Sequence, residues 1–139
     1  LFTHINEVIG MADIQKVRDL IMSTFSKVEG IMKVSDALNM MRDNTINAVL
    51  VEPRDENDVY SIMTLKDIAR KVIGKGRNLH ETHIYENMSK PVLSVNFDMP
   101  IPFAARFLTN FNVSYAMVIE NNEVIGMVSL NGMVNNWED

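Results

Sequence analysis

The sequence predicts a mixed α/β (α+β) fold built from two copies of one unit, which runs helix, strand, strand, helix. The first observation is a pair of matching amphipathic helices, one beginning at Ser35, its expected N-cap, and the other at Pro102. The second is that each helix precedes an apolar run, at residues 48–51 and 115–119. Consecutive apolar residues are typical of strands that are covered on both faces.

The third observation is a change from strand to helical periodicity at the same place in both copies. A connection rich in turn-forming residues leads to a second strand, expected at residues 59–63 and 124–128. Each of these strands continues directly into a helix. The helices are expected at residues 65–73, ended by Gly74, and at about 130–137.

A short leading segment that ends in Met introduces each copy, at residues 17–22 and 84–88. These segments set the domain boundaries that the repeat predicts. The sequence divides into an N-terminal extension (1–16), a first repeat (17–75), a linker (76–83) and a second repeat (84–139).

Composition narrows the functional classes. The 139 residues are 47% hydrophobic, which is enough for a core. The formal net charge of −5 provides no broad positive field for a nucleic acid, and no apolar run approaches the roughly 20 residues that cross a bilayer. The absence of cysteine excludes disulfides, thiolate metal sites and cysteine nucleophiles. A cytoplasmic protein with neither nucleic-acid nor membrane partners is expected.

The two strand-to-helix junctions carry related motifs. They read Ser61-Ile62-Met63-Thr64-Leu65-Lys66-Asp67 and Gly126-Met127-Val128-Ser129-Leu130-Asn131-Gly132. With the leading segments and the paired helices, these motifs resemble the tandem cystathionine-β-synthase (CBS) domain pair, or Bateman module, over residues 17–136. The family pattern at the junction is Gly, two apolar residues, Thr or Ser, any two residues, then Asp.

The resemblance implies both an architecture and a role. Two β-α-β-β-α repeats would pack by their three-stranded sheets around a pseudo-two-fold axis and leave clefts between the lobes. AMP, ADP, ATP or S-adenosylmethionine would be the regulatory ligand in such a cleft. The pair would form a homodimer and regulate an attached or partner protein, as in signal transduction, without catalysing a reaction.

Residue chemistry at the first junction fits a nucleoside. The hydroxyl of Thr64 can face a cleft near a phosphate, and Asp67, on the first helical turn, can accept two hydrogen bonds from a ribose diol. Ser61 leaves room for a ligand near the backbone, and Lys66 can add charge to a phosphate. The same Thr-x-x-Asp spacing also predicts a capping box that serves only the helix. We favour the nucleoside role, and the two roles can coexist for Thr64.

The second junction departs from the family pattern. Gly126 and Ser129 are retained, but Gly132 stands where the acidic residue belongs, so this cleft is expected to be degenerate. By resemblance, Ile46 and Ala48 flank the base in the first site, although both residues also fit an ordinary core.

Other groups of polar residues in the sequence predict neither a metal site nor a catalytic site. The stretch from His80 to His83 lacks the i, i+4 histidine spacing of zinc proteases, and no metal is predicted. No spacing of Ser and His residues indicates a catalytic triad. The alternative to ligand sensing is a dimerising or protein-binding scaffold with degenerate nucleotide sites, which Ser61 and Gly132 favour and which Thr64 and Asp67 oppose.

Overall fold

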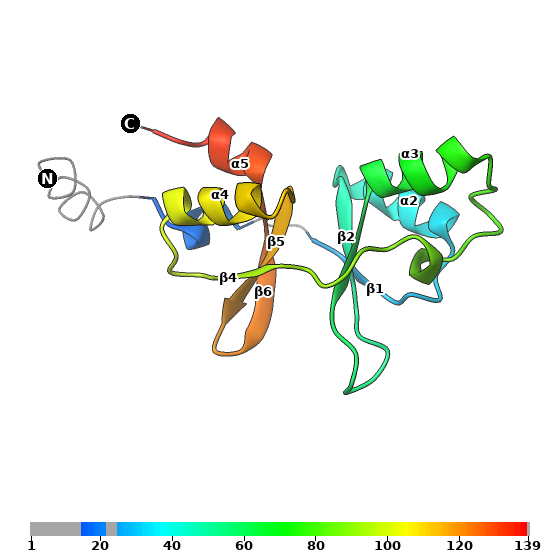
Figure 1. Ribbon diagram of the computed structural model, residues 1–139, viewed down its shortest axis with the longest axis horizontal. Helices are drawn as coiled ribbons and strands as arrows, with labels where there is room; N and C mark the ends of the chain where they lie inside the picture. The colour runs from blue at the N-terminus through cyan, green and yellow to red at the C-terminus, as the bar shows by residue number, and fades with distance from the viewer. Residues whose placement is uncertain (1–14, 22–24, 139) are drawn as a thin grey trace, which may run out of the picture. The chain divides into compact units, whose positions relative to one another are not determined.

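The computed structural model describes residues 15–21 and 25–138 (Figure 1). The expected N-terminal extension therefore lies almost entirely outside the described residues. The described chain forms two compact units, one made of residues 25–92 and the other of residues 15–21 and 93–138. Each unit contains one three-stranded sheet.

The unit of residues 25–92 contains the first repeat. Its sheet has the order β1-β2-β3, with β1 parallel to β2 and β2 antiparallel to β3. Its elements are β1 (Lys27–Val28), α2 (Val34–Asn44), β2 (Ala48–Val51), β3 (Ser61–Thr64), α3 (Leu65–Lys71), η2 (Ile73–Lys75) and η3 (Ile84–Glu86). All four residues of β2 are buried, which confirms the strand expected at residues 48–51 with both faces covered.

Two expected helix boundaries in this unit are wrong. Ser35 does not cap α2, because the helix begins one residue earlier, at Val34, and the buried Ser35 donates its backbone N–H to the Leu79 carbonyl. Gly74 does not end α3, which passes through Val72 into the 3-10 turn η2. A Cβ at Gly74 would lie 2.8 Å from the Ala69 carbonyl oxygen, so this glycine permits a close approach.

A glycine two residues further on, Gly76, adopts the left-handed conformation. Gly76 has φ of 67° and follows η2 directly. The expected helix end at residue 73 is therefore two residues too late for α3, which ends at Lys71, and the left-handed glycine follows η2 at position 76.

The other unit repeats the same plan. Its sheet has the order β4-β5-β6, again with one parallel and one antiparallel pair. Its elements are η1 (Val17–Leu20), β4 (Ser94–Asn96), α4 (Ile101–Asn110), β5 (Tyr115–Glu120), β6 (Glu123–Ser129) and α5 (Leu130–Asn135). Figure 1 shows α4 and α5 side by side, and α5 begins directly where β6 ends. Both repeats are therefore present, and the predicted mixed α+β fold class is confirmed.

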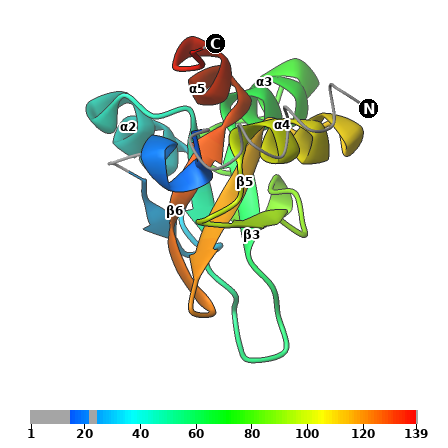
Figure 2. The same cartoon turned by 90° about the vertical axis from the view of Figure 1, so that its left-hand side faces the viewer.

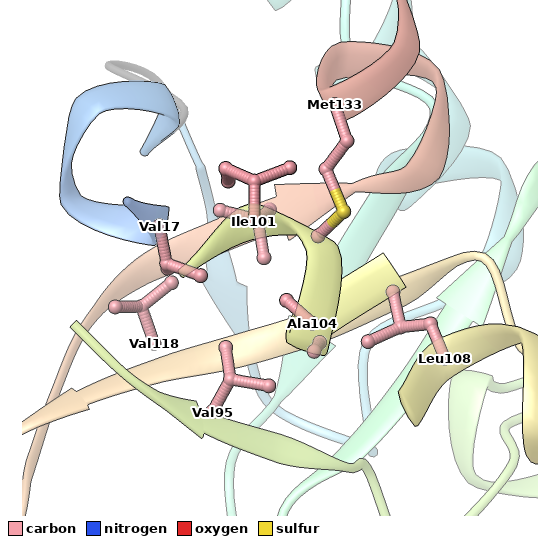
Figure 3. Close-up of a cluster of buried hydrophobic side chains, with 9 residues drawn as sticks. Val17, Val95, Ile101, Ala104, Leu108, Val118 and Met133 are labelled. Carbon is pink, nitrogen blue, oxygen red and sulfur yellow. The ribbon is translucent and has the colours of Figure 1, made fainter. Parts of the chain in front are cut away.

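The leading segment at residue 17 packs into the core of the second repeat. Val17 is fully buried, and Figure 3 shows it beside Val118 of β5 and close to Ile101 of α4. The backbone N–H of Val17 donates to the Met99 carbonyl, so the contact is hydrogen-bonded as well as apolar. Residues 17–20 thus belong in space to the repeat that lies about eighty positions later in the sequence.

The second leading segment, at residues 84–88, packs in turn into the unit of the first repeat. Ile84 is fully buried in the unit of residues 25–92, and its backbone N–H donates to the Met32 carbonyl. The backbone N–H of Tyr85 donates to the carbonyl of Gly30. The leading segment that precedes the first repeat in the sequence thus packs with the second repeat, and the one that precedes the second repeat packs with the first.

The two hairpin connections differ in length. The connection between β2 and β3 extends well beyond the strands, whereas β5 and β6 are joined by a tight turn at Asn121 and Asn122, both at positive φ (Figure 2). In the described part of the chain, no helix has both the length and the apolar character that a membrane span requires.

Candidate functional site: the first strand-to-helix junction

The first junction is a complete capping box. Thr64 ends β3 in an extended conformation and is the N-cap of α3. Its Oγ1 accepts the backbone N–H of Asp67 at 3.1 Å, and Asp67 Oδ2 accepts the backbone N–H of Thr64 at 2.9 Å. The Thr64 hydroxyl also donates to Oδ2 at 3.1 Å. The capping interpretation of the Thr-x-x-Asp spacing is confirmed.

The two oxygens of Asp67 have unequal partners. Oδ2 makes the short bonds of the capping box, whereas Oδ1 has only longer contacts. The Ser89 hydroxyl lies 3.4 Å from Oδ1, Lys71 Nζ lies 3.4 Å away and the exposed Arg70 guanidinium lies 3.7 Å away. These distances exceed the usual range for strong hydrogen bonds, so Oδ1 retains acceptor capacity although the residue is only 6% exposed.

A lysine links this carboxylate to a distant segment. Lys71 Nζ donates to the Asn87 carbonyl and to the Ser89 hydroxyl, both at 3.2 Å, in addition to its ion pair with Asp67. The backbone of Ser89 also pairs with Ile62 in β3, with N···O distances of 2.8 and 2.9 Å. Residues 87–89 are therefore attached to the junction by both side chains and backbone.

Sequence reasoning did not assign these partners to the site. The i+4 spacing of Lys71 from Asp67 on a helix does indicate an ion pair. Ser89 is 22 positions from Asp67 and directly follows the second leading segment. No local pattern could have found it.

The remaining predicted residues of the first site lie around the junction in different environments. Ala48 is the register partner of Thr64 on the neighbouring strand, so these two residues share a face of the sheet. Ser61 lies in β3, and Ser61, Ile46 and Ala48 are all buried. Lys66 is exposed on the first turn of α3. Their roles toward a ligand remain predictions.

The second junction has half of this arrangement. Ser129 is the N-cap of α5, and its Oγ accepts the backbone N–H of Gly132 at 3.0 Å. Gly132 offers no carboxylate in return, so the reciprocal bond of the capping box is missing. Gly126 is buried in β6 opposite Val118, next to a register shift between β5 and β6.

An ion pair between Asp58 and Lys90 joins the long connection between β2 and β3 to the residue that follows Ser89. Asp58 Oδ2 accepts the backbone N–H of Arg54 at 2.9 Å, and Lys90 Nζ lies 2.9 Å from Asp58 Oδ1. The Arg54 hydrogen bond first, and then Lys90, hold the pKa of Asp58 well below its ordinary value of 3.8. Lys90 thus attaches the segment at a second point.

The histidine stretch of the expected linker is occupied by local contacts. His83 Nδ1 lies 3.2 Å from Glu86 Oε1, and the His83 ring stacks on Tyr85 at 5.4 Å. Across residues 15–21 and 25–138, no three His, Asp or Glu side chains are grouped so that they could hold a metal ion.

Two repeated β-α-β-β-α units, each with a hydroxyl at a strand-to-helix junction, define a tandem-domain protein of the class that the sequence resembles. The CBS domain model matches residues 17–74 and 82–136. The chain belongs to the CBS domain family, as a tandem pair.

Known proteins support the same family. A mitochondrial CBS domain-containing protein of Arabidopsis thaliana, CBSX3, is 28% identical over 104 residues, which are 73% of this chain and 50% of that protein. The chain spans about half the length of the curated relatives it matches. The hexameric CBS-CP12 protein of bloom-forming cyanobacteria is 27% identical with a TM-score of 0.83, over 89% of this chain and 68% of that one.

A further structure shares the fold. The CBS domain pair of protein MJ0100, solved in complex with 5'-methylthioadenosine and S-adenosyl-L-methionine, is 22% identical with a TM-score of 0.73. The likeness covers 88% of this chain and 94% of that one.

Proposed function

We propose that this CBS pair is a regulatory module that binds an adenine nucleotide or another adenosyl ligand at the Thr64–Asp67 junction. AMP, ADP, ATP and S-adenosylmethionine are the candidate ligands. The observation that carries the proposal is the unequal use of the Asp67 carboxylate. Oδ2 completes the helix cap, while Oδ1 has only contacts of 3.4 Å and longer, so Oδ1 can accept a ribose hydroxyl without loss of the cap.

The remaining roles follow from the chemistry around Oδ1. A ribose diol donates hydrogen bonds, and a carboxylate is an acceptor-only partner that suits it. The exposed Lys66 on the same helical turn supplies charge for a phosphate, and the small buried Ser61 leaves space beside the strand. Ile46 and Ala48 are assigned to the base. The bound adenosyl ligands of the MJ0100 pair support this class of ligand.

One well-formed site is proposed for the chain. The second junction keeps Gly126 and Ser129 but has Gly132 in place of a carboxylate, so a ribose bound there would lack its acceptor. This difference between the junctions predicts a stoichiometry of one ligand per chain.

Regulation requires that the ligand distinguish between two arrangements of the pair. A ligand shifts such an equilibrium only by its differential affinity for the two states. The change in arrangement would modulate the activity of an attached or partner protein. No catalytic step is assigned to this chain. Self-association as a homodimer in the cytoplasm completes the proposal, and the hexameric state named for the CBS-CP12 protein supports oligomerisation in general.

A thermal-shift series with AMP, ADP, ATP, S-adenosylmethionine and 5'-methylthioadenosine tests this function. A ligand at about 100 times its Kd adds roughly 2.7 kcal/mol to the free energy of unfolding, which raises Tm by several degrees. Asp67→Asn should reduce the rise to about half, because a tenfold weaker Kd leaves roughly 1.4 kcal/mol of ligand stabilisation. Ser129→Ala is the matched control, because it removes a capping hydroxyl at the other junction and should leave the rise intact.

The second candidate function is a scaffold that binds no nucleotide. The favouring observation is that, among the described residues, the hydrogen-bond and ion-pair partners of Asp67 all lie within its own compact unit, so a structural role accounts for the residue. No Tm rise with any of the five ligands at millimolar concentration would favour the scaffold. Light scattering would then show whether the chain self-associates.

A further inference from the structure

The segment of residues 87–92 connects the candidate site to the rest of the chain. It follows η3, and the chain passes from one compact unit to the other directly after Val92. Three attachments hold it to the first repeat: the backbone pair of Ser89 with Ile62, the Lys71 ammonium at Asn87 and Ser89, and the ion pair of Lys90 with Asp58. Two of these attachments are charged side-chain contacts.

Lys71 stands at the centre of the attachment. Its ammonium group contacts Asp67 Oδ1, the Asn87 carbonyl and the Ser89 hydroxyl, one acceptor for each of its three N–H donors. The Lys71 side chain is 25% exposed and that of Asp67 is 9% exposed. This pair is therefore better shielded from solvent and salt than a typical surface ion pair.

We propose that Lys71 is a positioning residue that transmits the state of the Asp67 carboxylate to residues 87–92. This proposal rests on the proposed function, in which Asp67 Oδ1 accepts a ribose hydroxyl. The same oxygen accepts the Ser89 hydroxyl and holds the Lys71 ammonium. A ribose bound at Oδ1 competes with Ser89, and this competition supplies the differential contact that a switch requires.

The direction of the effect follows from the competition. When Ser89 loses its acceptor, residues 87–89 keep fewer bonds to the first repeat, and the pairing of Ser89 with Ile62 opens more often. Linkage makes the effect reciprocal, so a loosened segment also favours ligand binding. The site thereby controls the stretch that leads into β4.

Amide hydrogen exchange followed by NMR tests this inference with and without ligand. The reporters are the backbone amides of Ser89 and Ile62, which donate to each other's carbonyls. Lys71→Met keeps the apolar stem and removes the ammonium, so exchange at both amides should rise by roughly tenfold. Lys75→Met is the control, because Lys75 is an exposed lysine in η2 and its removal should leave the exchange unchanged.

Amide exchange in Asp67→Asn without ligand tests the other end of the Asp67–Lys71 ion pair. It weakens the anchor of Lys71 while an amide oxygen can still serve the cap, so exchange at Ser89 and Ile62 should also rise. The double variant with Lys71→Met should exchange no faster than Lys71→Met alone, because both changes break the same connection. Unchanged exchange at these amides in either single variant, or an additive rise in the double variant, overturns the inference.

The ligand arm separates the inference from the proposed function. AMP at millimolar concentration should raise exchange at Ser89 in the wild type and produce a smaller rise in Lys71→Met, where one of the two connections between Asp67 and Ser89 is already absent. If AMP produces no chemical-shift changes at Thr64 and Asp67, binding of AMP is refuted, and the two variants alone decide the role of Lys71. If AMP binds but leaves exchange at Ser89 unchanged, the transmission through Lys71 is refuted.

Discussion

The backbone N–H of Thr64 donates to the carboxylate of Asp67, and the backbone N–H of Asp67 donates to the hydroxyl of Thr64, at 2.9 and 3.1 Å. This reciprocal pair fixes the carboxylate against the start of α3 through one oxygen. The other oxygen is left with long contacts only. A structural cap and a ligand acceptor can therefore reside in the same side chain.

The hydroxyl of Thr64 should contribute measurably to stability. Thr64→Ala removes the acceptor of the Asp67 N–H and should lower the free energy of unfolding by about 1 kcal/mol. Thr64→Ser retains the hydroxyl and should recover most of this loss. Urea denaturation followed by circular dichroism measures both, and equal stability of the Ala and Ser variants would contradict the capping role.

A carboxylate at position 132 should complete the second capping box. Gly132→Asp places an acceptor three residues after Ser129, where the first junction has Asp67. Gly132→Ala is the matched control, because it supplies a Cβ without a carboxylate. An added Cβ lies 3.1 Å from Ser129 Oγ in either variant, so this tight contact cancels in the comparison.

The expected order of stability follows from these contributions. Asp is a poorer helix former than Ala by roughly 0.5 kcal/mol, and the restored bond and the helix dipole should offset this difference. Gly132→Asp should therefore be at least as stable as Gly132→Ala in urea denaturation. A deficit of about 0.5 kcal/mol would show that no reciprocal bond forms.

Asp58 should make stability depend on acid pH. Its pKa in the folded chain lies below its ordinary value of 3.8, so its ionised form contributes stability that is complete above about pH 4. This contribution is lost as the pH falls from there through the folded pKa. The stability advantage of the wild type over Asp58→Asn should be constant between pH 5 and pH 7 and should shrink below pH 4.

Urea midpoints at pH 7, 5 and 3 measure the Asp58 effect. Glu56→Gln is the control, because it removes a carboxylate from the exposed end of the same connection. If the difference between wild type and Asp58→Asn at pH 3 equals that at pH 7, the interaction with Arg54 and Lys90 does not favour the charged form.

Val17 should stabilise the second repeat despite its place near the start of the chain. The side chain is fully buried among Val118, Ile101 and their neighbours (Figure 3), so Val17→Ala removes two buried methyl groups and leaves a cavity. The expected loss is about 2 kcal/mol in the free energy of unfolding. Val134→Ala, at a position that is 73% exposed, should change stability by less than about 0.5 kcal/mol. Equal effects of the two substitutions would refute the packing of the leading segment.

The repeat and the local elements could be predicted from sequence because they depend on short-range patterns. The apolar run at residues 48–51 is β2, and the Thr-x-x-Asp spacing is the capping box. The partner of each leading segment could not be predicted, because periodicity near Val17 does not say which sheet will receive it. Ser89 was missed for the same reason, since it reaches Asp67 only through its backbone pairing with β3.

Asp67 is proposed to accept a hydroxyl of the ribose diol through Oδ1, and chemical removal of both ribose hydroxyls gives the sharpest test of this role. Isothermal titration should compare ATP with 2',3'-dideoxy-ATP on the wild type and on Asp67→Asn. We predict that the wild type binds ATP at least about tenfold more tightly than the dideoxy analogue, because hydrogen bonds to a charged group are lost. In Asp67→Asn the preference should fall to about twofold or less. Equal binding of the two nucleotides by the wild type, or an unchanged preference in Asp67→Asn, would contradict the assignment.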